Sequence, residues 1–216
     1  MQATYSASIR GLPWNVVLGI VTIRGVESGA LQTAVNSLGS IVLRQAEGNN
    51  PDLTRRMKTF ESFFAANSLR SPLAGQLEAI RSRGMPGGSP LVQALLLLEM
   101  STGLLMGAQD AGAIQGELLY DLAAEGETFR GMRTEVQCRK DEIVLRDSEG
   151  IIAALLQGPD YRTRLRNNTK DLMFFVFSVP GISLNEVQDG AEAIRALFKE
   201  ACAEIQAQVC QSSASV

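Results

Sequence analysis

The 216-residue sequence has no histidine, only three cysteines, and no apolar run long enough to cross a bilayer. Without histidine, the chain cannot form a His-dependent catalytic triad, a His-ligated metal site or an imidazole acid–base pair. Cys138, Cys202 and Cys210 lack paired spacing, which indicates a reducing compartment and not a disulfide framework. The apolar run Trp14–Ile23 is too short to span a membrane, and no small-residue cleavage site follows it. The protein is therefore expected to be cytoplasmic, with no membrane partner and no metal or cofactor.

Charged residues make up 20% of the chain, and the net charge is −3. This balance gives no global attraction for nucleic acid, so DNA is not expected as a partner and any RNA contact has to use a local cationic patch. The length is ample for one sizeable core. We expect a single domain over residues 14–210, an irregular polar arm over 1–13 and a disordered tail over 211–216, in a monomer or a homodimer.

A tight hairpin is predicted in the C-terminal half of the chain. Two short apolar runs, Glu142–Arg146 and Ile151–Leu156, flank Asp147-Ser148-Glu149-Gly150, whose glycine can take the positive φ of such a turn. A polar loop over residues 157–171 follows, and the aromatic, β-branched run Leu172–Ser178 predicts a buried strand after it. A cationic loop between buried strands favours a functional role. Ordinary surface arginines on a solvated loop fit the same charges equally well.

Helical spacing of apolar residues predicts five helices. The segment Leu91–Met106 is apolar on nearly every face, so it is expected to be the buried central helix. Glu99, its only acid, is expected at a cap, in solvent or at the mouth of a site, because lone carboxylates are rarely buried. Arg55, Arg56 and Lys58 are expected on a solvated helix face. The predicted helices cover Ser28 to about Ala46, Pro51 to Phe64, Ser71 to Gly84, Leu91 to Met106 and, from a capping box at Ser183, residues 183–205.

Short strands are predicted at Trp14–Arg24, near Glu117–Leu122, and at the edge-like segments Thr128–Met132 and Glu135–Arg139. Gly107–Asp110 is interpreted as a turn that leaves the central helix. Cys138 is interpreted as a packed or surface thiol, because no base can be named to activate it.

An ordered series of short motifs resembles a known family. The series consists of Ser71-Pro72 through Glu78, Met85-Pro86, Pro90-Leu91-Val92, Gly107–Asp110, Gly116, Glu125-Gly126-Glu127, Glu142-Ile143-Val144, Asp147, Glu149-Gly150, Gly158-Pro159-Asp160, Arg162-Thr163 and Thr169-Lys170. Over roughly residues 14–200 the chain resembles freestanding relatives of the tRNA-binding B3/B4 domain, the editing domain of the phenylalanyl-tRNA synthetase β subunit. The resemblance implies an α+β fold with a central mixed β-sheet, a buried central helix and flanking helices.

The same resemblance implies a trans-acting aminoacyl-tRNA deacylase, an editing hydrolase that clears a mischarged or non-protein amino acid from tRNA. An aminoacyl ester is already activated, so groups that orient a water and steady the oxyanion can suffice without histidine. The family often carries histidine at the position of Gly107 and favours asparagine at that of Leu96, so a less polar pocket is expected here. Two other interpretations stay open. One is a biosynthetic enzyme or binding protein for a small amino-acid-like metabolite that uses the same pocket without tRNA, and the other is an inactive interaction module.

Five residues are expected to converge on one pocket, because they close two turns at the ends of buried elements. In this hypothesis Asp110 or Asp160 orients the attacking water, and Gln109 and Thr163 donate hydrogen bonds to the carbonyl oxygen. Arg162 holds a phosphate or a carboxylate. The alternative is that Asp110 caps a helix and Thr163 pairs at a sheet edge.

A cationic ridge is predicted in the same loop. Arg162, Arg164 and Arg166 alternate, so in an extended segment they project toward one face, with Tyr161 on the other. Lys170 continues the ridge. We expect this ridge to follow the acceptor end of tRNA, with Tyr161 either stacking on a terminal base or packing against the protein.

Overall fold

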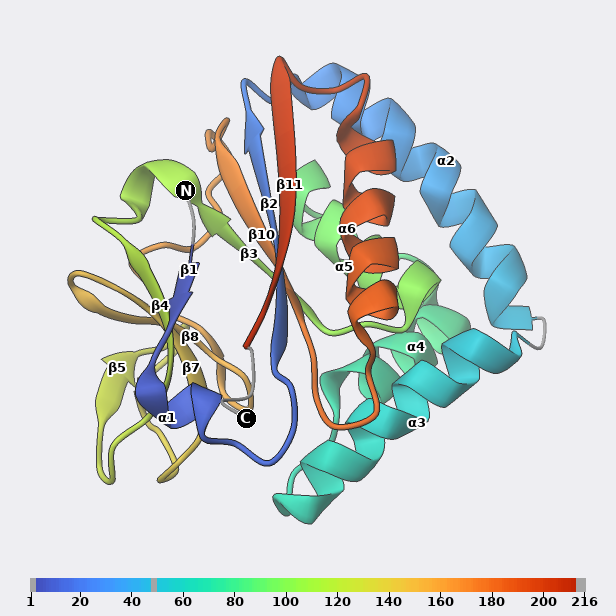
Figure 1. Ribbon diagram of the computed structural model, residues 1–216. Helices are drawn as coiled ribbons and strands as arrows, with labels where there is room; N and C mark the ends of the chain where they lie inside the picture. The colour runs from blue at the N-terminus through green and yellow to red at the C-terminus, as the bar shows by residue number, and fades with distance from the viewer. Residues whose placement is uncertain (1–2, 48–49, 213–216) are drawn as a thin grey trace.

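An antiparallel sheet lies at the centre of the molecule (Figure 1). The structure is a computed structural model and describes residues 3–47 and 50–212. The four strands run in the spatial order β11 (Glu204–Gln211), β2 (Val17–Arg24), β10 (Leu172–Phe177) and β3 (Met106–Asp110). All six residues of β10 are buried, as its aromatic and β-branched composition predicts. This strand pairs with β2 on one side and with β3 on the other, and so anchors the core.

A second sheet has mixed pairing. Its five strands run in the order β1 (Ala3–Tyr5), β4 (Leu118–Leu122), β7 (Ile143–Asp147), β8 (Gly150–Ala154) and β9 (Gly158–Pro159). β1 is parallel to β4, and the other pairs are antiparallel. β7 and β8 form the predicted hairpin, and its glycine has φ +139°. A separate two-stranded ribbon joins β5 (Thr128–Arg130) to β6 (Glu135–Gln137).

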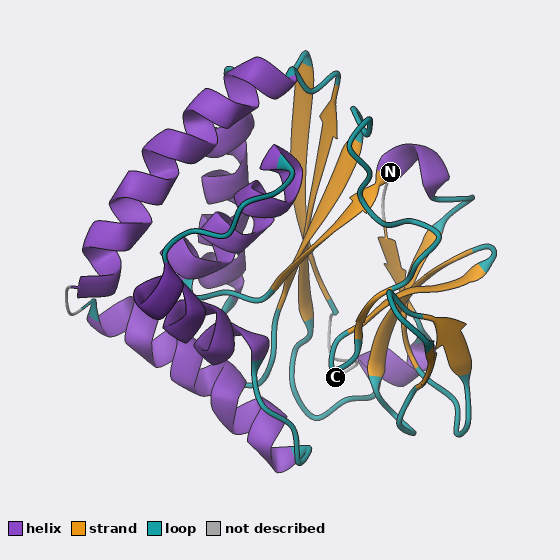
Figure 2. Ribbon diagram, turned by 180° about the vertical axis from the view of Figure 1, so that it is seen from behind, coloured by secondary structure: helices purple, strands orange, loops and turns teal. Residues whose placement is uncertain are grey.

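All helices but α1 (Ala7–Arg10), which packs against β4, are segregated from the second sheet (Figure 1). The others are α2 (Ser28–Glu47), α3 (Pro51–Ala66), α4 (Pro72–Arg83), α5 (Pro90–Thr102) and α6 (Leu184–Phe198). From α2 onward they lie against one face of the four-stranded sheet, and the five-stranded sheet lies on its other side (Figures 1 and 2). This arrangement confirms an α+β fold with a mixed sheet and a buried central helix. Among the described helices, none combines the length and apolar character that a bilayer crossing requires.

Capping residues fix the starts of α5 and α6 as the sequence predicts. The Ser89 hydroxyl accepts a hydrogen bond from the Leu91 amide at 3.4 Å, and Pro90 occupies the first turn of α5. At α6, Ser183 and Glu186 form a reciprocal capping box. Removing such a cap costs about 1 kcal/mol.

The central helix ends earlier than the sequence pattern indicates. Gly103 takes a left-handed conformation (φ +70°), and its N–H bonds to the Glu99 carbonyl, so α5 stops at Thr102. Residues Met106–Asp110 are therefore not the predicted helix end and turn but strand β3. The expected position of Glu99 is also wrong. Its side chain is buried, and its Oε1 accepts the Met106 N–H at 3.0 Å.

The C-terminal helix is shorter than predicted for a different reason. Its apolar stripe continues in the sequence past Phe198, but residues Glu204–Gln211 form β11 and not a helix. β11 pairs with β2 along its whole length, from Glu204↔Arg24 to Gln211↔Val17. The free edge of β2 thus provides a ladder of backbone hydrogen bonds that a continued helix would leave unmade.

The two ends of the chain are more ordered than expected. Residues 3–10 contain β1 and α1, where an irregular arm was predicted. At the other end, the buried Ser212 accepts the Val16 N–H through its hydroxyl at 2.9 Å. The expectation of a disordered tail over 211–216 is therefore wrong for Gln211 and Ser212, and residues 213–216 lie outside the described residues. The division into one domain over 14–210 stays a prediction.

The arginines of α3 do not all lie on a solvated face. Lys58 is exposed as expected, but the Arg56 guanidinium bonds to Glu186 and Asp189 of α6, each at 2.9 Å. Arg55 pairs with Glu186 as well. Burial opposes ionisation of Glu186, but hydrogen bonds from Ser183 and from both guanidiniums outweigh it and lower the pKa of Glu186 to about 2. These pairs tie α3 to the N-terminus of α6.

Candidate functional site

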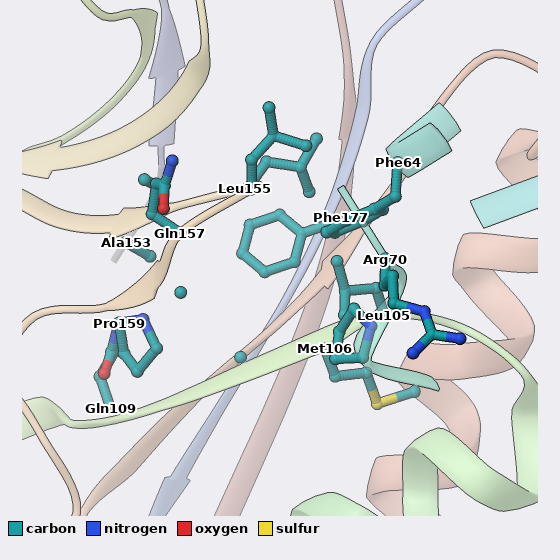
Figure 3. Close-up of a pocket in the computed structure, with 15 residues that line it drawn as sticks. Phe64, Arg70, Leu105, Met106, Gln109, Ala153, Leu155, Gln157, Pro159 and Phe177 are labelled. Carbon is teal, nitrogen blue, oxygen red and sulfur yellow. The ribbon is translucent and has the colours of Figure 1, made fainter. Parts of the chain in front are cut away.

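A pocket of about 250 Å³ lies between the two sheets (Figure 3). One wall comes from β3, Leu105 and the end of β10, and the other from β8, β9 and the residues between them. The α3–α4 junction closes one side. Apart from Arg70, Gln109 and Gln157, the lining is apolar. The remaining lining residues are Phe64, Pro72, Leu105, Met106, Gly107, Ala153, Ala154, Leu155, Leu156, Gly158, Pro159 and Phe177.

Gln109 lies beside Pro159 at one end of this pocket (Figure 3). Its side chain is fully buried, and its Nε2 donates to the Ile152 carbonyl at 2.8 Å. Its Oε1 has no hydrogen-bond partner within the described part of the chain. A buried acceptor without a donor costs roughly 1–3 kcal/mol. Because this oxygen is itself covered by protein atoms, a ligand or water that carries a donor reaches it only if the Gln109 side chain shifts.

Gly107 removes a side chain from the pocket wall. A Cβ at this position would lie 3.3 Å from the Phe177 ring, so a larger residue would project into the space between the sheets. The expectation of a less polar pocket fits this position. Leu96, the other departure from the family pattern, lines a different groove between α4 and α5 and does not contribute to the pocket.

Two polar residues at the pocket were not predicted from the sequence. The exposed Gln157 follows β8, and its side-chain amide has no partner in the region that the structure describes. The exposed Arg70 sits at the α3–α4 junction, on the side of Leu105 and Met106, and its guanidinium likewise has no hydrogen-bond or ion-pair partner among residues 3–47 and 50–212. The only signal in the sequence was their position: Gln157 directly follows an apolar run, and Arg70 directly precedes the N-cap residue of α4.

The five predicted site residues come together, but four of them do not line the pocket. Segments 109–110 and 160–164 meet through the Gln109↔Arg164 bridge and the Asp110 N–H to Thr163 carbonyl bond of 2.7 Å. Of the five, only Gln109 lines the cavity. The expected convergence of all five side chains on one pocket is thus not what the structure shows. Direct catalytic roles for the other four stay predictions.

Asp160 and Thr163 form a buried pair that shapes the loop. The Asp160 carboxylate accepts the Thr163 N–H at 3.0 Å, the Thr163 hydroxyl, and the Arg162 N–H at 3.1 Å. Asp110 is engaged in a similar way. It caps the short 3-10 turn η1 (Ala111–Ala113) through the Gly112 N–H, and its other oxygen accepts from the Thr169 hydroxyl at 2.9 Å. The alternative expectation for Asp110, a helix cap, fits this geometry.

The predicted cationic ridge is not continuous. Arg162 bonds to the buried Asp147 at 2.8 Å, and Arg166 lies 3.3 Å from Asp110. Arg164 does not project with them, because its guanidinium stacks on the Tyr161 ring, 3.6 Å from the centroid. Lys170 is exposed and not part of this network. Two of the three arginines are thus neutralised by internal carboxylates.

Metal and thiol chemistry find no support at these positions. Among the described residues, no cluster of three or more histidine, cysteine, aspartate or glutamate side chains is placed to hold a metal ion. Cys138 is buried, and burial raises its pKa to about 11, so the thiol form dominates near neutrality. This agrees with its interpretation as a packed thiol.

The fold and the pocket define an α+β domain with a small apolar cavity between two sheets. Comparison with protein-family models finds no match, and comparison with curated proteins finds no significant one. Among solved structures, one match is the crystal structure of an N-terminal fragment of the phenylalanyl-tRNA synthetase β subunit from Pyrococcus horikoshii. The TM-score is 0.52 at 12% sequence identity, and the match covers 96% of this chain and 49% of that one. The chain therefore spans about half the length of the fragment, and the likeness shows a similar fold.

Proposed function

We propose that the chain is a trans-acting aminoacyl-tRNA deacylase that hydrolyses the ester of a mischarged or non-protein amino acid. The observation that carries this proposal is the pocket between the sheets, with its apolar walls and with the unpartnered Oε1 of Gln109 buried in one of them. A volume of about 250 Å³ lies below the roughly 300–1,000 Å³ of sites for larger ligands, so it suits a group of amino-acid size. The similar fold of the synthetase fragment supports the same class of substrate.

The residues at the pocket suggest how the ester is cleaved. The amino-acid side chain packs against Phe177 and Leu155. A shift of the Gln109 side chain exposes its Oε1 to a water, which donates one hydrogen to it. The oxygen of this water attacks the ester carbonyl carbon, and the Gln157 amide donates to the oxyanion that forms. The carbon–oxygen bond to the ribose then breaks, and the ribose oxygen takes a proton that the water gives up. The products are the free amino acid and tRNA with a free hydroxyl.

Within this proposal the buried Asp160–Thr163 pair does not touch the substrate but holds the pocket wall in place. Asp160 follows Pro159 directly, and its N–H donates to the Ile152 carbonyl at 3.0 Å, the same oxygen that receives the Gln109 amide. Both wall segments therefore share one acceptor. Loss of the Asp160 carboxylate would release the turn that holds Pro159 against Gln109.

The test is deacylation of a panel of mischarged tRNAs by the wild type and two variants. Gly107→Leu fills the pocket, and Gln157→Ala removes the proposed oxyanion donor. We expect the wild type to hydrolyse at least one aminoacyl-tRNA, and both variants to do so at least about tenfold more slowly, since one oxyanion donor contributes about 10²–10³ in kcat. Gly29→Leu, at an exposed position where nothing lies within 4 Å of an added Cβ, is the matched control. If the wild type hydrolyses no ester above background, the deacylase proposal is wrong.

A second candidate is an enzyme or binding protein for a free amino-acid-like metabolite. The observation that favours it is the neutralisation of Arg162 and Arg166 by Asp147 and Asp110, which weakens the loop as a phosphate-binding ridge. Arg70 at the pocket would then pair with the free carboxylate of the metabolite.

Salt dependence separates the two candidates. Binding of tRNA should weaken steeply with added salt, because several phosphates release counterions, whereas binding of a small zwitterion should change little. Arg70→Ala should lower affinity for free amino acids at least about tenfold if the second candidate is right, as measured by calorimetry. Arg83→Ala, an exposed arginine away from the pocket between the sheets, is the control.

A further inference from the structure

An exposed tyrosine on the second sheet's side of the molecule lies between two arginines. Tyr161 is 41% exposed, although large aromatic residues are usually buried. The Arg164 guanidinium lies 3.6 Å from its ring centroid, and that of Arg130, from β5, lies 5.7 Å away. We call Tyr161, Arg164, Arg130 and Arg133, which lies in the turn between β5 and β6, the Tyr161 platform.

Backbone and side-chain hydrogen bonds hold this platform in place. The Tyr161 N–H donates to the Arg130 carbonyl at 2.7 Å, and Gly131 pairs with Asp160 in the neighbouring position. Arg164 donates from Nη1 to the Tyr161 carbonyl at 2.6 Å while it stacks on the ring. The ring and the Arg164 guanidinium are thus ordered before any ligand arrives, which lowers the entropy lost on binding.

The charges of the platform differ from those of the rest of the loop. Arg162 and Arg166 pair with Asp147 and Asp110, but in the described residues no carboxylate lies within 4.0 Å of the Arg130, Arg133 or Arg164 guanidiniums. Glu135 faces Arg130 across the β5–β6 ribbon and still makes no ion pair with it. A local positive surface therefore exists on a chain whose net charge is −3.

We propose that the Tyr161 platform binds the unpaired end of an RNA. The inference rests on the proposed deacylase function and names where the RNA part of that substrate lies. Aromatic rings and guanidinium planes stack on unpaired bases, and guanidiniums without carboxylate partners pair with phosphates. Tyr161 lies two residues beyond Pro159 of the pocket wall, a span of about 7 Å in an extended chain. An amino acid seated in the pocket is therefore close enough for its attached nucleotides to cross the platform.

The experiment measures binding of a labelled RNA stem-loop by fluorescence anisotropy, with and without an unpaired 3′ overhang. We expect the wild type to prefer the overhang, and Tyr161→Ala to weaken its binding about tenfold. Tyr161→Phe should bind as the wild type does, because stacking is retained. The double variant Arg130→Glu/Arg133→Glu should also make binding less sensitive to salt. The slope of the logarithm of the affinity against the logarithm of the salt concentration should fall by about 0.7 for each phosphate that the variant no longer neutralises.

A matched double variant, Arg44→Glu/Arg83→Glu, makes the same charge change on exposed residues of α2 and α4 and should bind normally. Thermal melting checks that each variant is folded. Free adenosine monophosphate competing as strongly as the overhang RNA would make the platform a nucleotide site and overturn the RNA proposal.

The remaining outcomes separate the two proposals. If the wild type deacylates tRNA while Tyr161→Ala and the Arg130/Arg133 variant bind RNA normally, the RNA-binding proposal for the platform is wrong and the deacylase proposal stands. If the wild type binds no RNA at low salt, both the RNA-binding proposal for the platform and the proposal of a tRNA substrate are wrong. The metabolite candidate then remains.

Discussion

At the residue scale, Glu99 has the most unusual surroundings in the chain. Its carboxyl group is only 3% exposed, between α4, α5 and the start of β3. Burial raises its pKa to about 8, and hydrogen bonds from the Met106 N–H and the Gln76 side chain oppose this only in part. The neutral form therefore dominates at neutral pH. Because Met106 also lines the pocket, this carboxyl group holds one pocket wall in position.

The buried Glu99 predicts a pH-dependent stability. Its folded pKa is raised above its unfolded value of 4.5, so its contribution is fully present below pH 4.5 and is lost as the pH rises toward 8. Across this window the free energy of unfolding should fall by up to about 1.4 kcal/mol per pH unit from this group. Urea denaturation at pH 5 to 8.5, compared with Glu99→Gln, measures it. Parallel pH profiles for both proteins would contradict the prediction.

The same residue shows where sequence reasoning stops. Helix starts were predictable because Ser89 and Ser183 act on amides within their own turn. The burial of Glu99 depends on α4 and β3, which approach it only in the folded chain. The ion pairs between Arg56 and α6 were not visible in the sequence for the same reason, since 130 positions separate Arg56 from Glu186.

At the scale of elements, the two wrong boundaries have distinct causes. The end of α5 had a local signal, a glycine after the last helical residue, that the apolar run beyond it obscured. The strand β11 had none, because the stripe of α6 continues through Ala201 and Ile205 by spacing alone. Residues 204–211 form a strand and not a helix because they pair with the free edge of β2, and no window of local sequence contains that edge.

Two glycines on neighbouring helices should respond in opposite ways to alanine. Gly103 has φ +70°, and a Cβ there would meet the Leu53 carbonyl oxygen at 2.9 Å. Gly103→Ala should therefore destabilise the fold by at least about 1–2 kcal/mol. Gly75 lies inside α4 with nothing within 4 Å, so Gly75→Ala should stabilise it by about 0.5–1 kcal/mol. Thermal or urea denaturation measures both, and equal shifts in one direction would refute the argument.

At the scale of the whole molecule, the candidate site belongs to no single segment. Gln109 and Phe177 come from one sheet, Pro159 from the other, and Arg70 from the α3–α4 junction. The sequence predicted the hairpin and the loop that carry part of this site, and it identified Gln109 and Gly107. It did not predict that Asp160 and Thr163 would bond to each other and not line the cavity, because their hydrogen-bond choices depend on how the sheets approach.

The long pairing between β11 and β2 predicts that the C-terminal strand is required for folding. A chain that stops at Ala203 removes the strand that pairs with residues 17–24 and the Ser212 hydroxyl that bonds to Val16, and it exposes apolar side chains of β2. We expect this chain to unfold without a cooperative transition, as followed by circular dichroism and calorimetry. A chain that lacks only residues 213–216 keeps β11 and Ser212 and is the control. A cooperative transition in the shorter chain would show that β11 is dispensable.

The void between the sheets also determines how the molecule responds to compression. Unfolding under hydrostatic pressure is favoured by the poorly filled space that it eliminates, and apolar walls leave a pocket of about 250 Å³ poorly filled by water. The empty protein should therefore unfold at lower pressure than a variant in which Gly107→Leu occupies the gap. A molecule that fills the pocket should raise the unfolding pressure in the same way. High-pressure fluorescence thus offers a search for the natural occupant that assumes nothing about its chemistry.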